Sequence, residues 1–230
     1  MGFRINTNTT SLAAQNKLAQ NNKKMSESLG KLASGNRINK AADDAAGLAI
    51  SEKMKAQMRG TKQAERNAND GISMIQTAEG GLNEVSNILT RLRELSVQAA
   101  SDTVGESERE FTNKEYQNLK QEIQRISQVT EFNGKQLLDG TGDQYEVQIG
   151  INNDSFEDRL TYDAGATNSS LESLGIGDLS VASQEGAQNS LNKLDDAIQQ
   201  VSGQHSELGA LQNRLSSTIR NLQTSHENLS

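Results

Sequence analysis

The chain has 230 residues, of which 33% are hydrophobic and only 3% aromatic, and its formal net charge is −7. Because large aromatic side chains bury the most area per residue, this composition disfavours a thick globular core and favours long helices packed along narrow apolar seams. The negative charge argues against a nucleic-acid-binding surface, and no stretch reaches the roughly 18 apolar residues of a membrane span. Proline and cysteine are absent, which permits long uninterrupted helices and excludes disulfides and thiolate metal sites.

The N-terminal segment, residues 5 to about 33, is polar and rich in asparagine. Its sparse apolar positions include Ile5, Leu12, Ala19, Leu29 and Leu32. This pattern predicts a helix that is weak on its own, because isolated helices depend on a packed apolar face, and Ser34-Gly35-Asn36 predicts its end. Residues 1–17 lack the basic region and apolar block of a cleavable signal peptide, so the protein is either cytosolic or exported by a route that uses no such signal.

A stronger pattern runs from Ala41 to Ala100. Apolar residues at spacings of three and four form a heptad-like seam: Ile75, Ala78, Leu82, Val85, Leu89, Leu92 and Ala99, with Ser96 as a polar lapse and a looser face upstream (Ile50, Met54, Met58, Ala64 and Ala68). Gly71, Gly80 and Gly81 argue against one unbroken rod, since each costs about 1 kcal/mol relative to alanine. A further helix is predicted from Ser107 to Val129, with Leu119, Ile123 and Ile126 facing inward.

The pattern then changes to alternation. Tyr145, Val147, Ile149 and Ile151 share one face, so residues 144–162 are predicted to form a hairpin with a loop around residues 152–154. Residues 164–183, rich in glycine, serine and aspartate, are predicted to be a long exposed connection.

The C-terminal segment has the most regular seam. Ala187, Leu194, Val201, Leu208, Leu215, Leu222 and Leu229 follow one another at a step of seven, and the companion positions four residues later include the polar residues His205, Gln212 and His226. This predicts a long helix whose polar interruptions fix its register. The helix runs to Ser230 without a cap or breaker, as if it continued further.

No catalytic or metal-binding constellation is evident. With two histidines and no cysteine, the chain offers no nucleophile–base pair, and His205 and His226 would lie about 31 Å apart along one helix. His226-Glu227-Asn228-Leu229-Ser230 begins like a zinc-protease motif but ends in serine. The sequence therefore predicts a protein that is not an enzyme and has no cofactor.

Several blocks of the sequence resemble bacterial flagellins. In the N-terminal half they are Leu32–Asn39, Ala42–Ser51, Asp70–Gly80, Leu92–Ala99 and Glu131–Leu138, and near the C-terminal end Leu208–Leu215. The similarity covers most of residues 4–150 and 190–230. Agreement over so many blocks is far more specific than a short motif.

The resemblance implies a mainly α fold, an elongated antiparallel helical bundle or coiled-coil rod with a small β-hairpin. Residues 1–44 would be the N-terminal filament-core segment, residues 45–163 and 184–230 the two parts of the rod, and residues 164–183 a short exposed variable loop. Flagellins usually continue with a further helix beyond the position of Ser230, so the sequence is expected to lack the C-terminal core helix.

The implied function is that of a self-polymerising subunit of the flagellar filament that serves swimming motility, secreted without a cleavable signal peptide. The polymerisation candidates are Ile5, Leu12, Ala19, Leu29 and Leu32. Implied partners are further copies of the chain, the flagellar export apparatus, the filament cap and an export chaperone, with no nucleic acid and no membrane.

The resemblance also implies recognition by a Toll-like receptor of innate immunity, with Arg91, Leu95 and Glu115 at the matching positions. From periodicity alone, Arg91 and Glu115 are ordinary solvated helix charges. The alternative function is a hook–filament junction protein, which resembles flagellin at its ends. The Asp43–Ser51 block and the short central region favour a flagellin.

Overall fold

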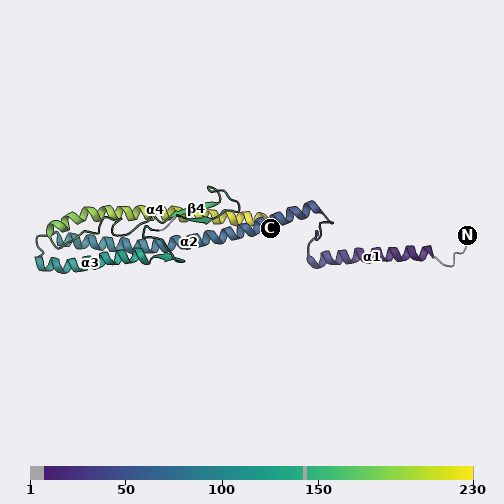
Figure 1. The fold of residues 1–230 in the computed structure, drawn as a ribbon, viewed down its shortest axis with the longest axis horizontal. Helices are drawn as coiled ribbons and strands as arrows, with labels where there is room; N and C mark the ends of the chain where they lie inside the picture. Colours follow the sequence, from purple (N-terminus) through teal and green to yellow (C-terminus); the bar gives the residue numbers. More distant parts are fainter. Residues whose placement is uncertain (1–7, 142–143, 230) are drawn as a thin grey trace. The chain divides into compact units, whose positions relative to one another are not determined.

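The computed structural model describes residues 8–141 and 144–229. The chain divides into two compact units, with the boundary between Gln57 and Met58. The helices are α1 (Thr9–Ser34), α2 (Ala45–Ala99), α3 (Glu106–Val129) and α4 (Gln184–Leu229), and the strands are β1 (Glu131–Phe132), β2 (Lys135–Gln136), β3 (Gln144–Gln148) and β4 (Arg159–Asp163). The predicted mainly helical class with a small antiparallel hairpin is confirmed (Figure 1).

The first unit contains α1 and the beginning of α2. The Asn8 side chain caps α1 by accepting a hydrogen bond from the Ser11 N–H at 3.1 Å, and Gly35 ends the helix with φ 67°. A left-handed residue after a helix is the usual position for glycine, because it has no Cβ. No described residue of α1 is buried within the chain.

In the second unit, α3 and α4 pack along α2 and run antiparallel to it (Figure 1). Ion pairs and hydrogen bonds between the helices show the direction. Between α2 and α3, Arg109 donates to the Ala99 carbonyl and Arg91 pairs with Glu115. Between α2 and α4, Arg93 pairs with Asp195 and the Gln223 amide donates to Glu65. As position numbers fall along α2, they rise along α3 and α4. The short connection between α2 and α3 favours this arrangement for these two helices.

The predicted seams form the core of this bundle. All seven apolar seam residues predicted between Ile75 and Ala99 are buried, as are Ala187, Leu194, Val201, Leu208 and Leu215 of α4. Ser96, the polar residue that interrupts the seam, is buried too, and the Ser190 hydroxyl donates to Ser96 Oγ at 3.0 Å. Ile50 and Met54, expected on the looser upstream face, are exposed in the first unit.

The helix α2 continues through all three glycines that argued against it. A Cβ on Gly81 would lie 2.7 Å from both Leu138 Cδ1 and Thr130 Oγ1, and one on Gly71 would lie 3.3 Å from the Val147 methyl groups. These two glycines allow the hairpin region to approach the helix closely. The packing gained there offsets the low helix propensity of glycine.

Two short hairpins lie between α3 and α4 in the chain. Asn133 (φ 52°) and Gly134 (φ 76°) connect β1 to β2 with two left-handed residues, as expected for an Asn-Gly turn. In the second hairpin, Val147 faces Leu160 and Tyr145 faces Tyr162. The predicted strand alternation is confirmed as far as Ile149, whereas Ile151 lies in the loop and is exposed.

The prediction that residues 164–183 are an exposed connection is wrong for much of the segment. Its buried side chains are Ala164, Thr167, Ser169, Leu174, Ile176 and Val181. Composition misled here, because glycine and serine mark irregular backbone but do not determine exposure. The polar backbone of a buried irregular segment needs hydrogen-bond partners, and the neighbouring helices supply them.

A row of polar side chains on α3 binds this connection. Lys120 Nζ donates to the carbonyl oxygens of Gly177 and Leu179 at 2.6 and 2.8 Å, and the Gln117 amide also donates to Leu179. Asn113 Oδ1 accepts from the Val181 N–H and Gln124 Oε1 from the Leu171 N–H. From α4, the amide of buried Gln204 donates to the Asn168 carbonyl at 3.1 Å.

Candidate functional surfaces

Large hydrophobic side chains remain exposed along α1. They are Leu12, Leu18, Met25, Leu29 and Leu32, and Leu32 is 80% exposed. Leu12, Leu29 and Leu32 are among the predicted polymerisation candidates. Ala19, the fourth candidate on this helix, is exposed as well. Ile5 lies outside the described residues.

Helix geometry divides the candidates between two faces. At about 100° per residue, Leu18, Met25, Leu29 and Leu32 fall within an arc of about 60°. Leu12 and Ala19 point about 110–130° away from the middle of that arc. We call the four residues of the narrow arc the α1 stripe. Leu18 and Met25 were not selected from the sequence, although the step of seven from Leu18 through Met25 to Leu32 is visible there.

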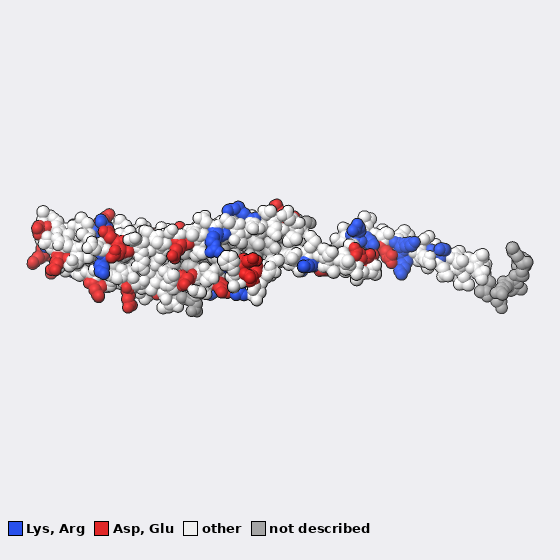
Figure 2. Space-filling view, turned by 90° about the horizontal axis from the view of Figure 1, so that it is seen from above, with Lys and Arg blue, Asp and Glu red and all other residues white. Residues whose placement is uncertain are grey.

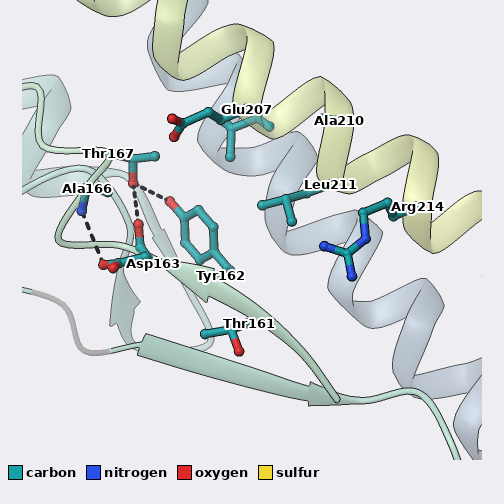
Figure 3. Close-up of a pocket in the computed structure, with 10 residues that line it drawn as sticks. Thr161, Tyr162, Asp163, Ala166, Thr167, Glu207, Ala210, Leu211 and Arg214 are labelled. Atoms are coloured by element: carbon teal, nitrogen blue, oxygen red, sulfur yellow. Dashed lines mark hydrogen bonds between the residues drawn. The ribbon is translucent and has the colours of Figure 1, made fainter. Parts of the chain in front are cut away.

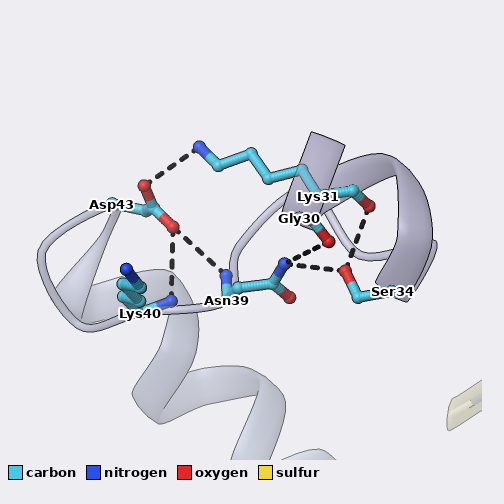
Figure 4. Close-up of polar contacts among 6 residues, drawn as sticks. All are labelled: Gly30, Lys31, Ser34, Asn39, Lys40 and Asp43. Carbon is cyan, nitrogen blue, oxygen red and sulfur yellow. Dashed lines mark hydrogen bonds and ion pairs between the residues drawn. The ribbon is translucent and has the colours of Figure 1, made fainter. Parts of the chain in front are cut away.

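The turn after α1 folds back onto the helix end (Figure 4). Lys31 Nζ pairs with Asp43 Oδ1 at 2.9 Å, and the other carboxylate oxygen accepts the N–H groups of Asn39 and Lys40. The Asn39 amide donates to Ser34 Oγ at 2.7 Å. The hydrogen bond from Lys31 is the main cause that lowers the pKa of Asp43. The turn is thus held by charge and polar contacts rather than by an apolar core.

Two of the three receptor candidates lie together on the surface of the bundle. Arg91 forms ion pairs with Glu115 at 3.0 Å and with Glu94 at 2.9 Å, and all three side chains are about half exposed. Leu95 differs, because it is 2% exposed and belongs to the core. A direct contact with a partner needs an accessible side chain, so the burial of Leu95 gives no support to it as a contact residue, and Arg91 and Glu115 remain as candidates.

A groove of about 310 Å³ lies between β4, the following connection and α4 (Figure 3). Its lining is mainly apolar and includes Tyr162, Leu208, Ala210 and Leu211. Glu207 and Arg214 extend from α4 toward the groove at different places along the helix (Figure 3). The opposite wall includes Asp163, whose carboxylate accepts the N–H groups of Gly165 and Ala166.

Other chemistry is not evident in the described part of the chain. Neither His205 nor His226 belongs to a cluster of three or more metal-ligating residues among residues 8–141 and 144–229. In the same ranges, no helix combines the length and the hydropathy needed to cross a bilayer. On the face that Figure 2 shows, acidic and basic side chains are scattered over the second unit and form no continuous basic surface.

Comparison with known proteins agrees with the helical architecture. The profile of the bacterial flagellin N-terminal helical region matches residues 5–143, and that of the bacterial flagellin C-terminal helical region matches residues 191–230. A flagellin of Halalkalibacterium halodurans is 44% identical over 227 residues, which are 98% of this chain and 82% of that protein. A flagellin of Bacillus subtilis is 41% identical over 261 aligned residues, covering 99% of this chain and 84% of the relative.

A solved structure supports the same relationship. The crystal structure of Bacillus cereus flagellin superposes with a TM-score of 0.61 at 34% sequence identity. The superposition covers 68% of this chain and 88% of the crystallised one.

Proposed function

This chain belongs to the bacterial flagellin family, and from that premise we propose that the α1 stripe drives its polymerisation. Members of the family are structural proteins that polymerise into the flagellar filament, so the chain is a filament subunit and not an enzyme. The proposal concerns which residues of the subunit hold the filament together.

The observation that carries the proposal is the exposure of the α1 stripe. A helix of 26 residues that buries none of its side chains gains little to offset its loss of conformational freedom. Fully burying one leucine or methionine side chain contributes about 1.5–3 kcal/mol. Packing of the stripe against further copies would supply that burial, and contacts between different patches of identical subunits propagate into filaments.

The test replaces Leu18, Met25, Leu29 and Leu32 together with serine. We expect filament growth from seeds to be abolished, while the thermal melting of the second unit stays unchanged because its core contains no α1 residue. A matched variant carries Leu12→Ser and Ala19→Ser on the other face. Equal loss of filaments in both variants would show that no single face of α1 is decisive.

We further propose a division of the chain for assembly. Residues 1–44 serve as the filament-core segment, residues 45–163 and 184–230 as the rod, and residues 164–183 as a short link. The bonds from α3 and α4 to the link support a compact rod. We also propose that the protein is exported without a cleavable signal through the flagellar export apparatus. Its further partners in this proposal are an export chaperone and the filament cap. Secretion by a strain lacking that apparatus would contradict it.

The receptor proposal is that Arg91 and Glu115 contact a Toll-like receptor. Their support is an exposed, mutually oriented ion pair that joins α2 to α3. In a reporter-cell assay, Arg91→Ala is expected to lower potency, whereas Arg125→Ala, which removes another exposed arginine paired within α3, is the control. Equal potency of Arg91→Ala and the parent protein removes the proposal.

The alternative of a hook–filament junction protein has less support, since the two relatives described above, which align over 98% and 99% of this chain, are named flagellins. Complementation of a strain without filaments distinguishes the two. A filament subunit restores long filaments, and a junction protein does not.

A further inference from the structure

The loop between β3 and β4 exposes a phenylalanine. Phe156 is 86% exposed, the highest exposure of the large hydrophobic side chains described. Leaving such a ring in water forgoes the stabilisation that its burial would give. Aromatic residues also contribute strongly at protein interfaces. Phe156 is therefore a candidate anchor for a partner.

Two aspartates hold the loop around this ring. Asp154 Oδ1 accepts the N–H groups of Phe156 and Glu157 at 2.8 and 2.9 Å. The carboxylate of buried Asp158 accepts the N–H groups of Asn152 and Asp154 at 3.3 and 3.0 Å. A loop that is already ordered loses less conformational entropy on binding than a flexible one. The ring is thus presented by a preorganised loop.

The groove beside β4 has the size and lining to receive an aromatic ring. A cavity of about 150 Å³ lined by apolar side chains is enough to bind benzene, and the groove measures about 310 Å³. Leu211, Ala210 and the buried ring of Tyr162 form an apolar part of its lining (Figure 3). The exposure of Phe156 shows that this ring does not fill the groove of its own chain.

One pair of charged residues, Glu157 on the loop and Arg214 at the groove, is complementary. The loop carries Glu157 directly beside Phe156, and Arg214 extends toward the groove from α4 (Figure 3). Glu207 and Asp163 also lie at the groove, but the Asp163 carboxylate is bonded to the N–H groups that follow it. An orientation with Glu157 next to Arg214 places the acidic side of the loop at the basic part of the groove.

We propose that Phe156 of one copy inserts into the β4–α4 groove of a second copy, with Glu157 paired to that copy's Arg214. The inference rests on the proposed function, since it names one contact within the assembled filament. The ring and the groove are different patches of the same chain, so the contact is heterologous and leaves one ring and one groove free at the ends of a row. Contacts of this kind extend assemblies without closing them.

Cross-linking tests the contact directly, because the chain contains no cysteine. Chains carrying Phe156→Cys are mixed with chains carrying Ala210→Cys, grown from wild-type seeds and oxidised. We expect covalent dimers on a non-reducing gel, formed in filaments and absent from monomers. Phe111→Cys mixed with Ala210→Cys is the control, since Phe111 is also an exposed phenylalanine, 69% exposed, but lies on α3. Filaments that form without the specific dimers overturn the inference while leaving the proposed function intact.

The energetic test measures the critical concentration for filament growth. Removing the ring with Phe156→Ala is expected to raise it roughly ten- to hundredfold, and Phe111→Ala is expected to leave it near the parent value. Charge reversal by Glu157→Arg or Arg214→Glu should weaken growth, and the two changes together should restore it in part. A Phe156→Ala critical concentration equal to that of the parent, or no rescue by the double reversal, contradicts the proposed insertion. Failure of the parent chain itself to form filaments would contradict the proposed function instead.

Discussion

Tyr162 connects three segments of the second unit through one hydroxyl group. The side chain, on β4, is 1% exposed, and its hydroxyl donates to the Leu137 carbonyl at 2.9 Å. The hydroxyl of Thr167, in the connection, lies 2.7 Å away. Burial raises the pKa of Tyr162 to about 12. The hydrogen bonds depend on the protonated phenol, which makes this residue sensitive to alkaline pH.

Replacement by Tyr162→Phe is expected to change the alkaline limb of the stability curve. The folded pKa lies above the ordinary value of about 10, so the contribution of the phenol is fully present below pH 10 and is lost as pH rises toward 12. The difference between the folded and the ordinary pKa corresponds to a loss of about 2–3 kcal/mol in the free energy of unfolding once the phenol is fully ionised. At pH 7 the variant should lose about 1 kcal/mol, the usual worth of a hydrogen bond.

Denaturant unfolding at pH 7, 9 and 11 measures both effects. The parent should lose more stability than Tyr162→Phe between pH 9 and 11, so their difference narrows or reverses. Tyr145→Phe, across the hairpin, controls for the loss of a less buried hydroxyl. If the stability of the parent and that of Tyr162→Phe change in parallel up to pH 11, the raised pKa of Tyr162 is contradicted.

At the scale of elements, two adjacent glycines of α2 have different surroundings. Nothing lies within 4 Å of a Cβ built on Gly80, whereas one on Gly81 meets Leu138 and Thr130 at 2.7 Å. Leu138 is fully buried, and Thr130 Oγ1 is bonded to the Ile126 carbonyl. These neighbours have little room to move. Gly81 is therefore required for packing, and Gly80 is not.

Because their surroundings differ, replacing Gly80 and Gly81 with alanine is expected to have opposite effects on stability. Gly80→Ala should stabilise the protein by about 0.5–1 kcal/mol, since alanine is the better helix former. Gly81→Ala gains the same propensity but overpacks the contact with the hairpin region, which typically costs about 1–3 kcal/mol. Equilibrium unfolding of both variants measures the difference. Equal stabilisation by the two alanines would show that the hairpin region can shift away from α2.

The turn after α1 is expected to open in acid. Because the folded pKa of Asp43 is lowered, the bonds from Lys31, Asn39 and Lys40 are favoured above the ordinary carboxyl pKa of about 4 and are lost as pH falls below it. Hydrogen exchange of the Asn39 and Lys40 amides should therefore rise at low pH, relative to the intrinsic rate. In Asp43→Asn the protection of these amides should already be low at pH 7. A protection factor independent of both pH and the substitution would exclude this role of the carboxylate.

At the scale of the whole chain, the two units differ in how much they bury. The hydrophobic core runs from Ala68 to Leu215 and so lies entirely in the second unit. Amides are protected from exchange where opening requires disruption of buried contacts. In the monomer we expect α1 amides to exchange within seconds and those of the α2 and α4 seams to be slower by several orders of magnitude. Assembly into filaments should slow exchange in α1, and unchanged exchange there would argue against a structural role of α1 in the filament.

The sequence alone determined the helical seams, the strand alternation and the family. Periodicity is a local property, so the spacing of apolar residues was enough to assign Ile75 to Ala99 and Ala187 to Leu215 to buried faces. The α1 stripe was also present in the spacing of Leu18, Met25 and Leu32, but exposure was needed to distinguish it from a core-facing stripe. The family assignment relied on blocks that extend over most of the chain.

Only the tertiary structure determined which parts of the irregular segments are buried. Six side chains of residues 164–183 are buried, and Lys120, Gln117 and Gln204, remote in sequence, donate hydrogen bonds to backbone carbonyl groups of this segment. The need for Gly81 and the burial of Leu95 likewise depend on neighbours from other elements. Periodicity tells which face of a helix is apolar, but the partners of a polar backbone and the space beside a glycine are fixed only when distant segments pack together.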